Sequence, residues 1–516
     1  MWSKEDNMVH TIVSAGLEGI DAFLVDIEIV LSKQGMPSFI MVGLAQTAVK
    51  EAQDRVLTAI RSCRYTLPVA KIVVNLAPAD KKKSGSSYDL ALAIGILCSI
   101  GVIDETSIDS FLFVGELSLS GNIKRVSGVL PITLLARKHN IKNIIVPKEN
   151  GREASIVEGI CVYPASTLAE VVDFLQGNQS LTAIESDSSR LLQEQERYRF
   201  DFSEVKGQEH AKRAIEIAAA GDHNILFIGP PGSGKTMLSQ RIPSVLPPLS
   251  FEEALEVTKI YSVMNLLKSQ GIVTQRPFRS PHHTISESGL IGGGSIPKPG
   301  EVSLSHCGVL FLDELLEFNR HTLDILRQPL ESGNVTIARA FGSLTFPAQF
   351  MLVAAMNPCP CGYRTDPTRE CTCSTSTVAR YKSRLSGPML DRIDLHIEVP
   401  AVPYSDLAQG LSTTTSERMR TNITKARAIQ RERYQGTDCK GNAYLTGTLF
   451  EKHCTMKQQE HAFLEKAVYS LRLSARAYTK IIRIARTIAD LDDAPHIEVP
   501  HLAEAISCRT LDRETW

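Results

Sequence analysis

Gly229-Pro-Pro-Gly-Ser-Gly-Lys-Thr236 lies near the middle of the 516-residue chain and decides the fold of its central part. The glycines let backbone N–H groups close around phosphates, Lys235 brings a positive charge to the β- and γ-phosphates, and Thr236 brings a hydroxyl to Mg²⁺. The apolar run 224–228 before it predicts a buried parallel strand, and a helix can open from Met237. We therefore expect an α/β domain that binds a nucleoside triphosphate. The phosphate-binding residues would be Gly229, Pro230, Pro231, Gly232, Ser233, Gly234, Lys235 and Thr236.

Composition and charge narrow the class of protein. A length of 516 residues predicts about three domains, each able to bury its own core. The net charge of −1 excludes a chain that is basic throughout, so contacts with nucleic acid would need local basic patches. The polar N-terminus is unlike a signal peptide, and the longest apolar stretch, the 14 residues 90–103, is shorter than the roughly 20 that span a bilayer. We expect a cytoplasmic protein without a membrane span, with a buried core helix at 90–103 and cysteines that are thiols or metal ligands.

Periodicity along the chain indicates an α/β multidomain protein. Runs 24–30 and 71–76 are typical of strands, and 47–63 has helical spacing of its apolar residues. A polar stretch at 411–417 opens a helical C-terminal part. The expected segments are an N-terminal domain 1–176, a linker 177–200, an ATPase core 201–400 and a helical lid 401–516.

Two apolar strands downstream of the loop end in polar residues suited to ATP hydrolysis. The run 308–312 ends in Asp313, which can reach Mg²⁺, and Glu314, which can polarise the attacking water. The run 351–356 ends in Asn357, which would lie between the γ-phosphate and that water. The alternatives are a strand that ends in two solvated acids and an Asn-Pro pair that starts a turn.

These elements, in this order, resemble the AAA+ ATPases. The resemblance implies ATP and Mg²⁺ as ligands and a ring of identical subunits, a homohexamer. Within 386–394, Arg392 would be the arginine finger that reaches the γ-phosphate of the neighbouring subunit. Arg476 would contact nucleotide from the helical lid, and the segment 201–208 would pack against adenine. A surface arginine paired with Asp391 or Asp394 is the alternative for Arg392.

The closer resemblance, over essentially the whole chain, is to the magnesium-chelatase-like ATPases of the YifB/ComM competence type. It implies a DNA helicase that drives branch migration in natural transformation and recombination, with single-stranded and branched DNA, and possible recombination proteins, as partners. An ATP-dependent Lon-like protease and a magnesium chelatase motor subunit are the alternatives. The stretches that carry the resemblance are 276–284, 289–294, 326–331, 354–362 and 485–490.

Several basic residues are candidates for DNA contact. The run 334–346 predicts a hairpin, and related ATPases line their channel with such a hairpin. Arg339 on it and Lys298 in a Gly- and Pro-rich insert are our candidates for backbone phosphate contacts, with solvated loop charges as the alternative. Basic residues also recur along two C-terminal helical stretches, 418–433 and 472–486, where they face DNA, a neighbouring subunit or solvent. The pair His282-His283 is either structural or part of a metal site.

Four cysteines form an insert at 359–373. Thiolates at this spacing in a reducing compartment fit a tetrahedral structural Zn²⁺ directly after Asn357. Free thiols or a redox pair are the alternatives. The expected ligands are Cys359, Cys361, Cys371 and Cys373.

The N-terminal stretches 77–96 and 113–129 resemble Lon-type protease domains, which have the ribosomal protein S5 domain 2-like fold. Placed on that pattern, Ser87 occupies the nucleophile position, but Leu130 occupies the position of the lysine that takes its proton. Leucine cannot accept a proton, so we expect no peptidase activity. Ser87 would then cap a helix, and the adjacent lysines 81–83 would meet DNA or lie in a solvated loop.

Overall fold

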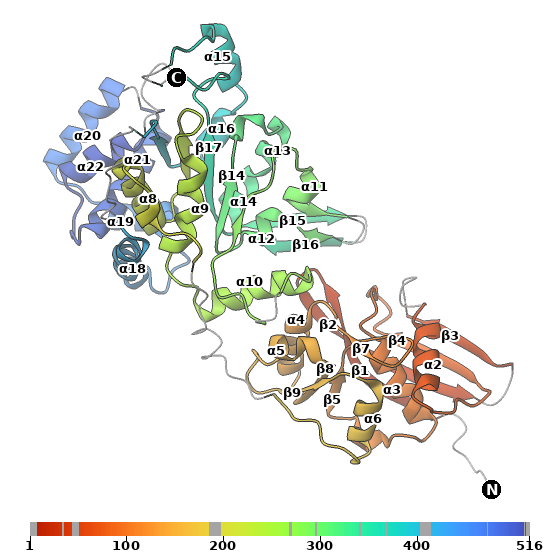
Figure 1. Cartoon of the computed structure of the whole chain (residues 1–516). Coiled ribbons are helices and arrows are strands. Elements are labelled where there is room, and N and C mark those ends of the chain that lie inside the picture. Colours follow the sequence, from red (N-terminus) through yellow and green to blue (C-terminus); the bar gives the residue numbers. More distant parts are fainter. Residues whose placement is uncertain are drawn as a thin grey trace. The chain divides into compact units, whose positions relative to one another are not determined.

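The computed structural model describes residues 8–32, 36–43, 51–184, 198–267, 271–294, 297–339, 342–364, 366, 369–402, 414–471, 473–509 and 511, with only the backbone of 339 and 342. The chain forms two units (Figure 1). Unit 1 comprises Met1–Gln195 and Ser250–Thr274, and unit 2 comprises Glu196–Leu249 and Gln275–Trp516. Most of the predicted linker and residues 411–413 of the polar stretch 411–417 lie outside the described residues.

Unit 1 is built on a seven-stranded sheet of mixed direction, in the order β3-β4-β2-β1-β5-β8-β9. The long hairpin of β1 and β2 and the β2–β4 pair are antiparallel, and the remaining pairs are parallel. The strands predicted at 24–30 and 71–76 are confirmed as parts of β2 and β4. The strands are β1 (Val9–Glu18), β2 (Asp21–Ser32), β3 (Ser38–Val42), β4 (Lys71–Ala77), β5 (Phe111–Phe113), β8 (Asn143–Pro147) and β9 (Cys161–Ala165), with a separate hairpin of β6 (Glu116–Leu117) and β7 (Ile123–Lys124).

A buried helix packs against this sheet, because its residues are apolar on every side. It is α3, over Asp89–Ser99, and it confirms the core helix expected within 90–103. Its one acid, Asp89, is fully buried, and its charge is compensated by Arg55, whose Nε lies 2.9 Å from the carboxylate. The other helices of the N-terminal segment are α2 (Ala52–Ser62), α4 (Val129–Lys138), α5 (Gly151–Ala154) and α6 (Leu168–Leu175).

Unit 1 also contains a helix from within the predicted ATPase core. This helix, α10 (Phe251–Val263), begins at Ser250 with a capping box and packs on α4 (Figure 1). Ser262 fastens the pair, because its carbonyl accepts from the N–H of Gly128 at 3.1 Å and its hydroxyl contacts Glu153. The segment 250–274 thus packs in unit 1, whereas the sequence pattern placed it in 201–400.

The centre of unit 2 is a five-stranded parallel sheet in the order β11-β14-β17-β10-β18. Three of these strands, β10, β14 and β17, are buried at every residue, as expected for a parallel sheet covered on both faces. This confirms a multidomain α/β protein with a parallel sheet. The strands are β10 (Ile225–Ile228), β11 (Phe278–Arg279), β14 (Val309–Leu312), β17 (Met351–Met356) and β18 (Leu395–Glu398).

Two hairpins and several short helices surround the sheet. The hairpin predicted at 334–346 is confirmed by β15 (Asn334–Arg339) and β16 (Gly342–Pro347), which pair antiparallel. The other elements here are α8 (Glu209–Gly221), α9 (Lys235–Val245), α11 (Glu287–Leu290), β12 (Gly292–Gly293), β13 (Lys298–Pro299), α12 (Glu301–Leu304), α13 (Arg320–Ile325), α14 (Arg327–Ser332), α15 (Thr375–Lys382) and α16 (Gly387–Leu390).

The C-terminal helices share one hydrophobic core with the parallel sheet. Phe227 of β10 and Ile484 of α21 belong to the same buried cluster. The C-terminal helices within 401–516 therefore do not have a hydrophobic core separate from that of the sheet. No helix in the described ranges is both long enough and apolar enough to cross a membrane. The helices are α18 (Ser416–Arg433), α19 (Gly447–His453), α20 (Gln458–Leu471), α21 (Ala475–Leu491) and α22 (Val499–Ser507).

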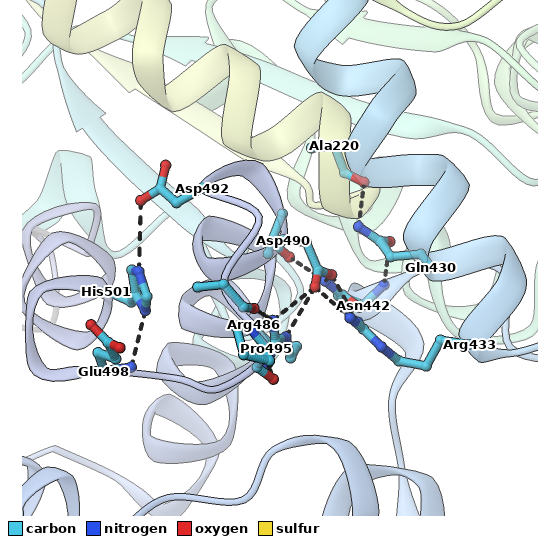
Figure 2. Close-up of polar contacts among 12 residues, drawn as sticks. Ala220, Gln430, Arg433, Asn442, Arg486, Asp490, Asp492, Pro495, Glu498 and His501 are labelled. Atoms are coloured by element: carbon cyan, nitrogen blue, oxygen red, sulfur yellow. Dashed lines mark hydrogen bonds and ion pairs between the residues drawn. The ribbon is translucent and has the colours of Figure 1, made fainter.

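A buried carboxylate connects three of these C-terminal segments. Figure 2 shows Asp490 of α21 between Arg433 of α18, Arg486 of its own helix and Asn442. Arg433 Nη1 lies 2.8 Å, Arg486 Nη2 2.9 Å and Asn442 Nδ2 2.8 Å from its oxygens. Asp490 is 3% and Arg486 2% exposed, so the pairing satisfies charges that water hardly reaches.

Candidate ATP site and metal centre

The phosphate-binding loop joins β10 to α9 at one edge of the parallel sheet. Gly232 and Gly234 have φ of 78° and 87°, a region that favours glycine. The ammonium of Lys235 lies 2.7 Å from the carbonyl oxygen of Gly229 and 2.9 Å from that of Pro230. Burial lowers the pKa of Lys235, and the charge of Asp313 opposes that shift. The loop is thus arranged around a positive charge at a helix N-terminus, which suits a polyphosphate.

The two downstream strands bring their polar residues to the same edge. Because β10, β14 and β17 run parallel, the residues after each strand emerge together. Thr236 Oγ1 donates to Asp313 Oδ2 at 2.7 Å, and Lys235 donates to Asn357 Oδ1 at 3.3 Å. A hydroxyl beside a carboxylate is an oxygen ligand set that Mg²⁺ uses. The residues present therefore fit the ion that the family implies.

Glu314 follows Asp313 in an unusual backbone conformation. Its φ of 50° lies in the left-handed region, and its N–H donates to Asp313 Oδ1 at 2.9 Å. This turn separates the two carboxylates: Asp313 contacts Thr236, while the Glu314 side chain is 59% exposed. An accessible carboxylate at this point is suited to polarise a water molecule.

His283 contacts Glu314, which the sequence analysis missed. Its Nδ1 lies 3.5 Å from Glu314 Oε2, and its ring packs against those of His282 and Phe318. The reason is sheet order: β11 pairs with β14, so the loops after both strands share an edge. The motif 276–284 indicated that this stretch is important for function. The contact between His283 and Glu314 could not be predicted from it, because that contact depends on the order of the strands in the sheet.

The predicted arginine finger and lid arginine lie close together. Arg392 donates to the carbonyl of Pro388 at 2.6 Å and forms an ion pair with Glu331. Arg476, 72% exposed, forms an ion pair with Asp391, the residue before the finger. Arg392 is thus in an ion pair with an acid of its own chain, as the alternative expected, but the partner is Glu331. Asp391 binds Arg476, and Asp394 binds Lys480 at 2.9 Å. Within the described part of the chain Arg476 pairs with Asp391 and not with the phosphate-binding loop, so its role at nucleotide stays a prediction.

The pKa of Asp394 shows how firmly this segment is held. Burial alone would raise the pKa of its carboxyl group, but Lys480 and His223 outweigh burial and hold it well below the ordinary value. Lys480 and Arg486 of α21 therefore bind Asp394 and Asp490, whereas Arg476 on the same helix stays mostly exposed. In α18 likewise, Arg420 and Arg427 donate to the carbonyls of Ser244 and Ala219.

The four insert cysteines converge as predicted. Their sulfur atoms all lie within 4.8 Å of one another. Cys359 Sγ is 3.3 Å from Cys361 Sγ and 3.6 Å from Cys371 Sγ. Tetrahedral Zn²⁺ with Zn–S bonds of about 2.3 Å places sulfur atoms roughly 3.8 Å apart, so the cluster fits a metal ion. A hydrogen bond from the backbone N–H of Tyr363 lowers the pKa of Cys361 to about 6, whereas burial raises the pKa of Cys359. The fit to a metal ion therefore rests on the geometry of the four sulfur atoms.

This cysteine loop also touches the phosphate-binding loop. Gly362 has φ of 86°, and a Cβ added there would lie 2.5 Å from Cδ of Pro231. The close approach therefore requires glycine. Order in the cysteine loop consequently constrains Pro231, which belongs to the predicted phosphate-binding residues.

The two candidate DNA-contact residues lie on short strands, and the two positions taken from the Lon pattern lie at the N-terminal ends of helices α3 and α4. Lys298 is exposed on β13, and Arg339 ends β15, its side chain lying outside the description. Lys83 is fully buried and donates to the carbonyl of Pro78, so it does not belong to an open basic patch, whereas Lys82 is exposed. The predicted cap by Ser87 is wrong, because α3 begins at Tyr88 with no side-chain cap. Leu130 is buried, its N–H donating to Glu153 at 2.9 Å.

The parallel sheet, the glycine-rich loop and the Asp-Glu pair define a P-loop ATPase of the AAA+ class. Three family models match the chain: "Magnesium chelatase, subunit ChlI" over 201–407, "Subunit ChlI of Mg-chelatase" over 27–150, and "Magnesium chelatase, subunit ChlI C-terminal" over 413–509.

Two curated relatives cover almost the whole chain, and a third covers about a third of it. Competence protein ComM of Haemophilus influenzae is 47% identical over 497 residues, 96% of both chains. Uncharacterized protein YifB of Escherichia coli is 43% identical over 509 residues, 98% of this chain and 97% of that protein. The magnesium-chelatase 38 kDa subunit of Rhodobacter capsulatus is 27% identical over 176 residues, 31% of this chain and 50% of that one. The chain belongs to the magnesium-chelatase-like family of ComM and YifB.

Proposed function

We propose that the protein is an ATP-hydrolysing motor that assembles as a hexameric ring, binds DNA and drives branch migration in natural transformation and recombination. The observation that carries the proposal is the convergence of Lys235, Thr236, Asp313 and Asn357 at one sheet edge. This arrangement occurs in a chain 47% identical to a competence protein. An ATP site alone would equally suit a scaffold that uses ATP only to assemble. The accessible carboxylate of Glu314 beside the site favours turnover.

Each residue has a definite task in hydrolysis. Lys235 exchanges the carbonyls of Gly229 and Pro230 for phosphate oxygens when ATP enters. Thr236 and Asp313 would hold Mg²⁺, which when bound would supply positive charge to the phosphates. Glu314 takes up the proton of the attacking water as it adds to phosphorus, and the bond from phosphorus to the leaving ADP oxygen breaks.

Residues outside this edge complete the motor. Asn357 orients the water, and Arg392 of a neighbouring subunit stabilises the charge that develops at the γ-phosphate. We propose that Lys298 and Arg339 contact DNA phosphates in the ring channel, where positive charges bind the backbone without regard to sequence. Such a motor would act in the cytoplasm on single-stranded and branched DNA, with recombination proteins as further partners.

A joint-migration assay tests this function. Purified protein with ATP and Mg²⁺ is incubated with a labelled four-strand joint, and both strand products and phosphate release are measured. We expect migration and DNA-stimulated hydrolysis, and neither with Lys235→Ala. Protein that assembles normally yet shows neither migration nor stimulation would rule the proposal out.

A magnesium chelatase motor subunit is the second candidate, because all three matching family models carry chelatase names. The chelatase relative, however, aligns with only 31% of this chain, whereas ComM aligns with 96%. Adding the protein to a chelatase reaction that lacks its motor subunit separates the two, since only a chelatase subunit restores metal insertion into porphyrin.

An ATP-dependent protease is disfavoured by Leu130. Its buried, apolar side chain occupies the position at which the Lon pattern needs a base for Ser87. ATP-dependent degradation of casein that is lost both in Lys235→Ala and in Ser87→Ala would reverse this conclusion.

A further inference from the structure

The arginine finger is folded back onto its own subunit. Arg392 is held through Nη1 by the carbonyl of Pro388 and through Nη2 by Glu331, and its side chain is 17% exposed. Its Nε is buried with no partner within the described part of the chain. The carboxylate of Glu331 occupies the Nη2 end of this guanidinium, so a phosphate of another subunit has to displace Glu331 before it binds that end.

A change of conformation at Arg392 is confined to its side chain, because its backbone is fixed by hydrogen bonds. Its backbone carbonyl accepts from Asn224 Nδ2 at 2.9 Å, and the carbonyl of Asn224 accepts from the N–H groups of Asp394 and Leu395. The backbone is thereby fixed to β10 and β18. The space for rotation exists, because Arg392, Glu331 and Lys480 line an open pocket of about 570 Å³.

Glu331 lies at the base of the β15–β16 hairpin. It is the penultimate residue of α14, which ends at Gly333 in the left-handed conformation. Ser332 Oγ donates to the carbonyl of Asn334 at 3.0 Å, and the N–H of Ala348 donates to the carbonyl of Gly333 at 2.8 Å. The hairpin and the carboxylate are therefore parts of one short connected stretch, and displacement of the hairpin moves Glu331.

The ion pair suits a reversible restraint. Glu331 is 62% exposed, and exposed ion pairs contribute little to stability because water and salt screen them. A polyphosphate carries more negative charge than one carboxylate and can compete for the guanidinium.

We propose that Glu331 restrains the Arg392 finger in a subunit without DNA, and that DNA pressing on the β15–β16 hairpin withdraws Glu331 and releases the finger for the neighbouring ATP site. The inference rests on the proposed ring ATPase and deepens it, since it assigns the coupling between DNA and hydrolysis to one ion pair. Glu331 is a positioning residue, because it acts through Arg392.

The variant Glu331→Gln tests the restraint in the full-length protein. Phosphate release is measured with and without DNA, and the melting temperature checks folding. We expect basal kcat to rise roughly threefold or more with KM for ATP unchanged, because a finger acts in the transition state. Stimulation by DNA should fall by the same factor. Glu331→Asp, which shortens the carboxylate side chain, should give a smaller rise and serves if the first variant fails to fold.

Two controls separate the restraint from a structural effect. In an Arg392→Ala background, Glu331→Gln should change nothing, since no finger remains to release. Asp492→Asn removes a half-exposed carboxylate paired with Arg213 in the same unit and should leave basal turnover unchanged. An unchanged basal kcat in folded Glu331→Gln, or a rise that persists without Arg392, overturns the proposal. Suppose that DNA does not stimulate wild-type hydrolysis but Glu331→Gln raises basal kcat. The proposed DNA motor and the role of the hairpin would then be rejected, whereas the restraint of Arg392 by Glu331 would be supported.

Discussion

Replacing Asp490 by asparagine should destabilise unit 2 more than other conservative changes to its carboxylates. The substitution keeps the shape of the side chain but removes its charge. It also places an NH₂ group toward Arg433, Arg486 and Asn442, all of which are donors (Figure 2). One of the two acceptor oxygens and the charge that compensates the arginines are therefore lost at a site 3% exposed.

The expected magnitude follows from the burial of the arginines. Arg486 and Arg433 have side chains 2% and 14% exposed, so water cannot replace the lost carboxylate. Removing one partner of a buried ion pair costs about 3–5 kcal/mol. At about 2–4 °C per kcal/mol for a large domain, the melting temperature should fall by roughly 10 °C.

Thermal unfolding of the intact chain, followed by calorimetry, measures this loss. Asp492→Asn is the matched control, because Asp492 is 46% exposed and pairs with Arg213 at 3.2 Å and His501 at 3.6 Å. An exposed pair contributes about 0–1 kcal/mol, so the control should shift the transition by no more than a few degrees. Equal shifts in the two variants, or a loss below about 1 kcal/mol for Asp490→Asn, would refute the role we assign to burial.

Four further predictions concern the ATP site, the metal centre and pH. Lys235→Ala should abolish binding of a fluorescent ATP analogue, whereas Glu314→Gln should bind it and hydrolyse ATP at least about 100-fold more slowly; fast turnover in the latter would contradict the assigned role. His283→Ala should lower kcat about tenfold with little change in KM, because Glu314 loses the contact that orients it, and an unchanged kcat would show that the contact is incidental. Elemental analysis should find about one zinc ion per chain, lost in Cys371→Ser; well under one in the wild type would exclude the metal. Asp394 has a lowered pKa in the folded state, so its carboxylate stabilises the fold at pH values above its unfolded pKa of about 4. This stability is lost as the pH falls below that value. The melting temperature of Asp394→Asn should therefore decline less between pH 5 and 3 than that of the wild type.

The sequence predicts well where a local pattern determines the result. The run before Gly229 and the runs that end in Asp313 and Asn357 are buried strands, because a strand covered on both faces has no polar positions. Parallel strands then bring these polar ends to one edge, so the composition of the candidate ATP site could be predicted.

The remaining contacts depend on strand order and on packing between distant segments. That β11 lies beside β14, which brings His283 to Glu314, has no local signal in either strand. The ion pair of Glu331 and Arg392 joins residues 61 positions apart, and Lys83 is buried although its lysine-rich surroundings indicate a solvated loop. Charged residues are the hardest to place from the sequence, because the same side chain can face solvent or pair with a buried partner.

The placement of α10 in unit 1 has a consequence for synthesis on the ribosome. Translation runs from the N-terminus, and domains generally fold as they emerge. Unit 1, however, needs Ser250–Thr274 to cover α4, and those residues are made only after β10 and α9 of unit 2. The N-terminal unit therefore waits, incompletely covered, until the ATP-binding strand and helix have been translated. Nascent chains released before residue 274 should therefore need chaperones, because unit 1 is complete only once that residue has been translated.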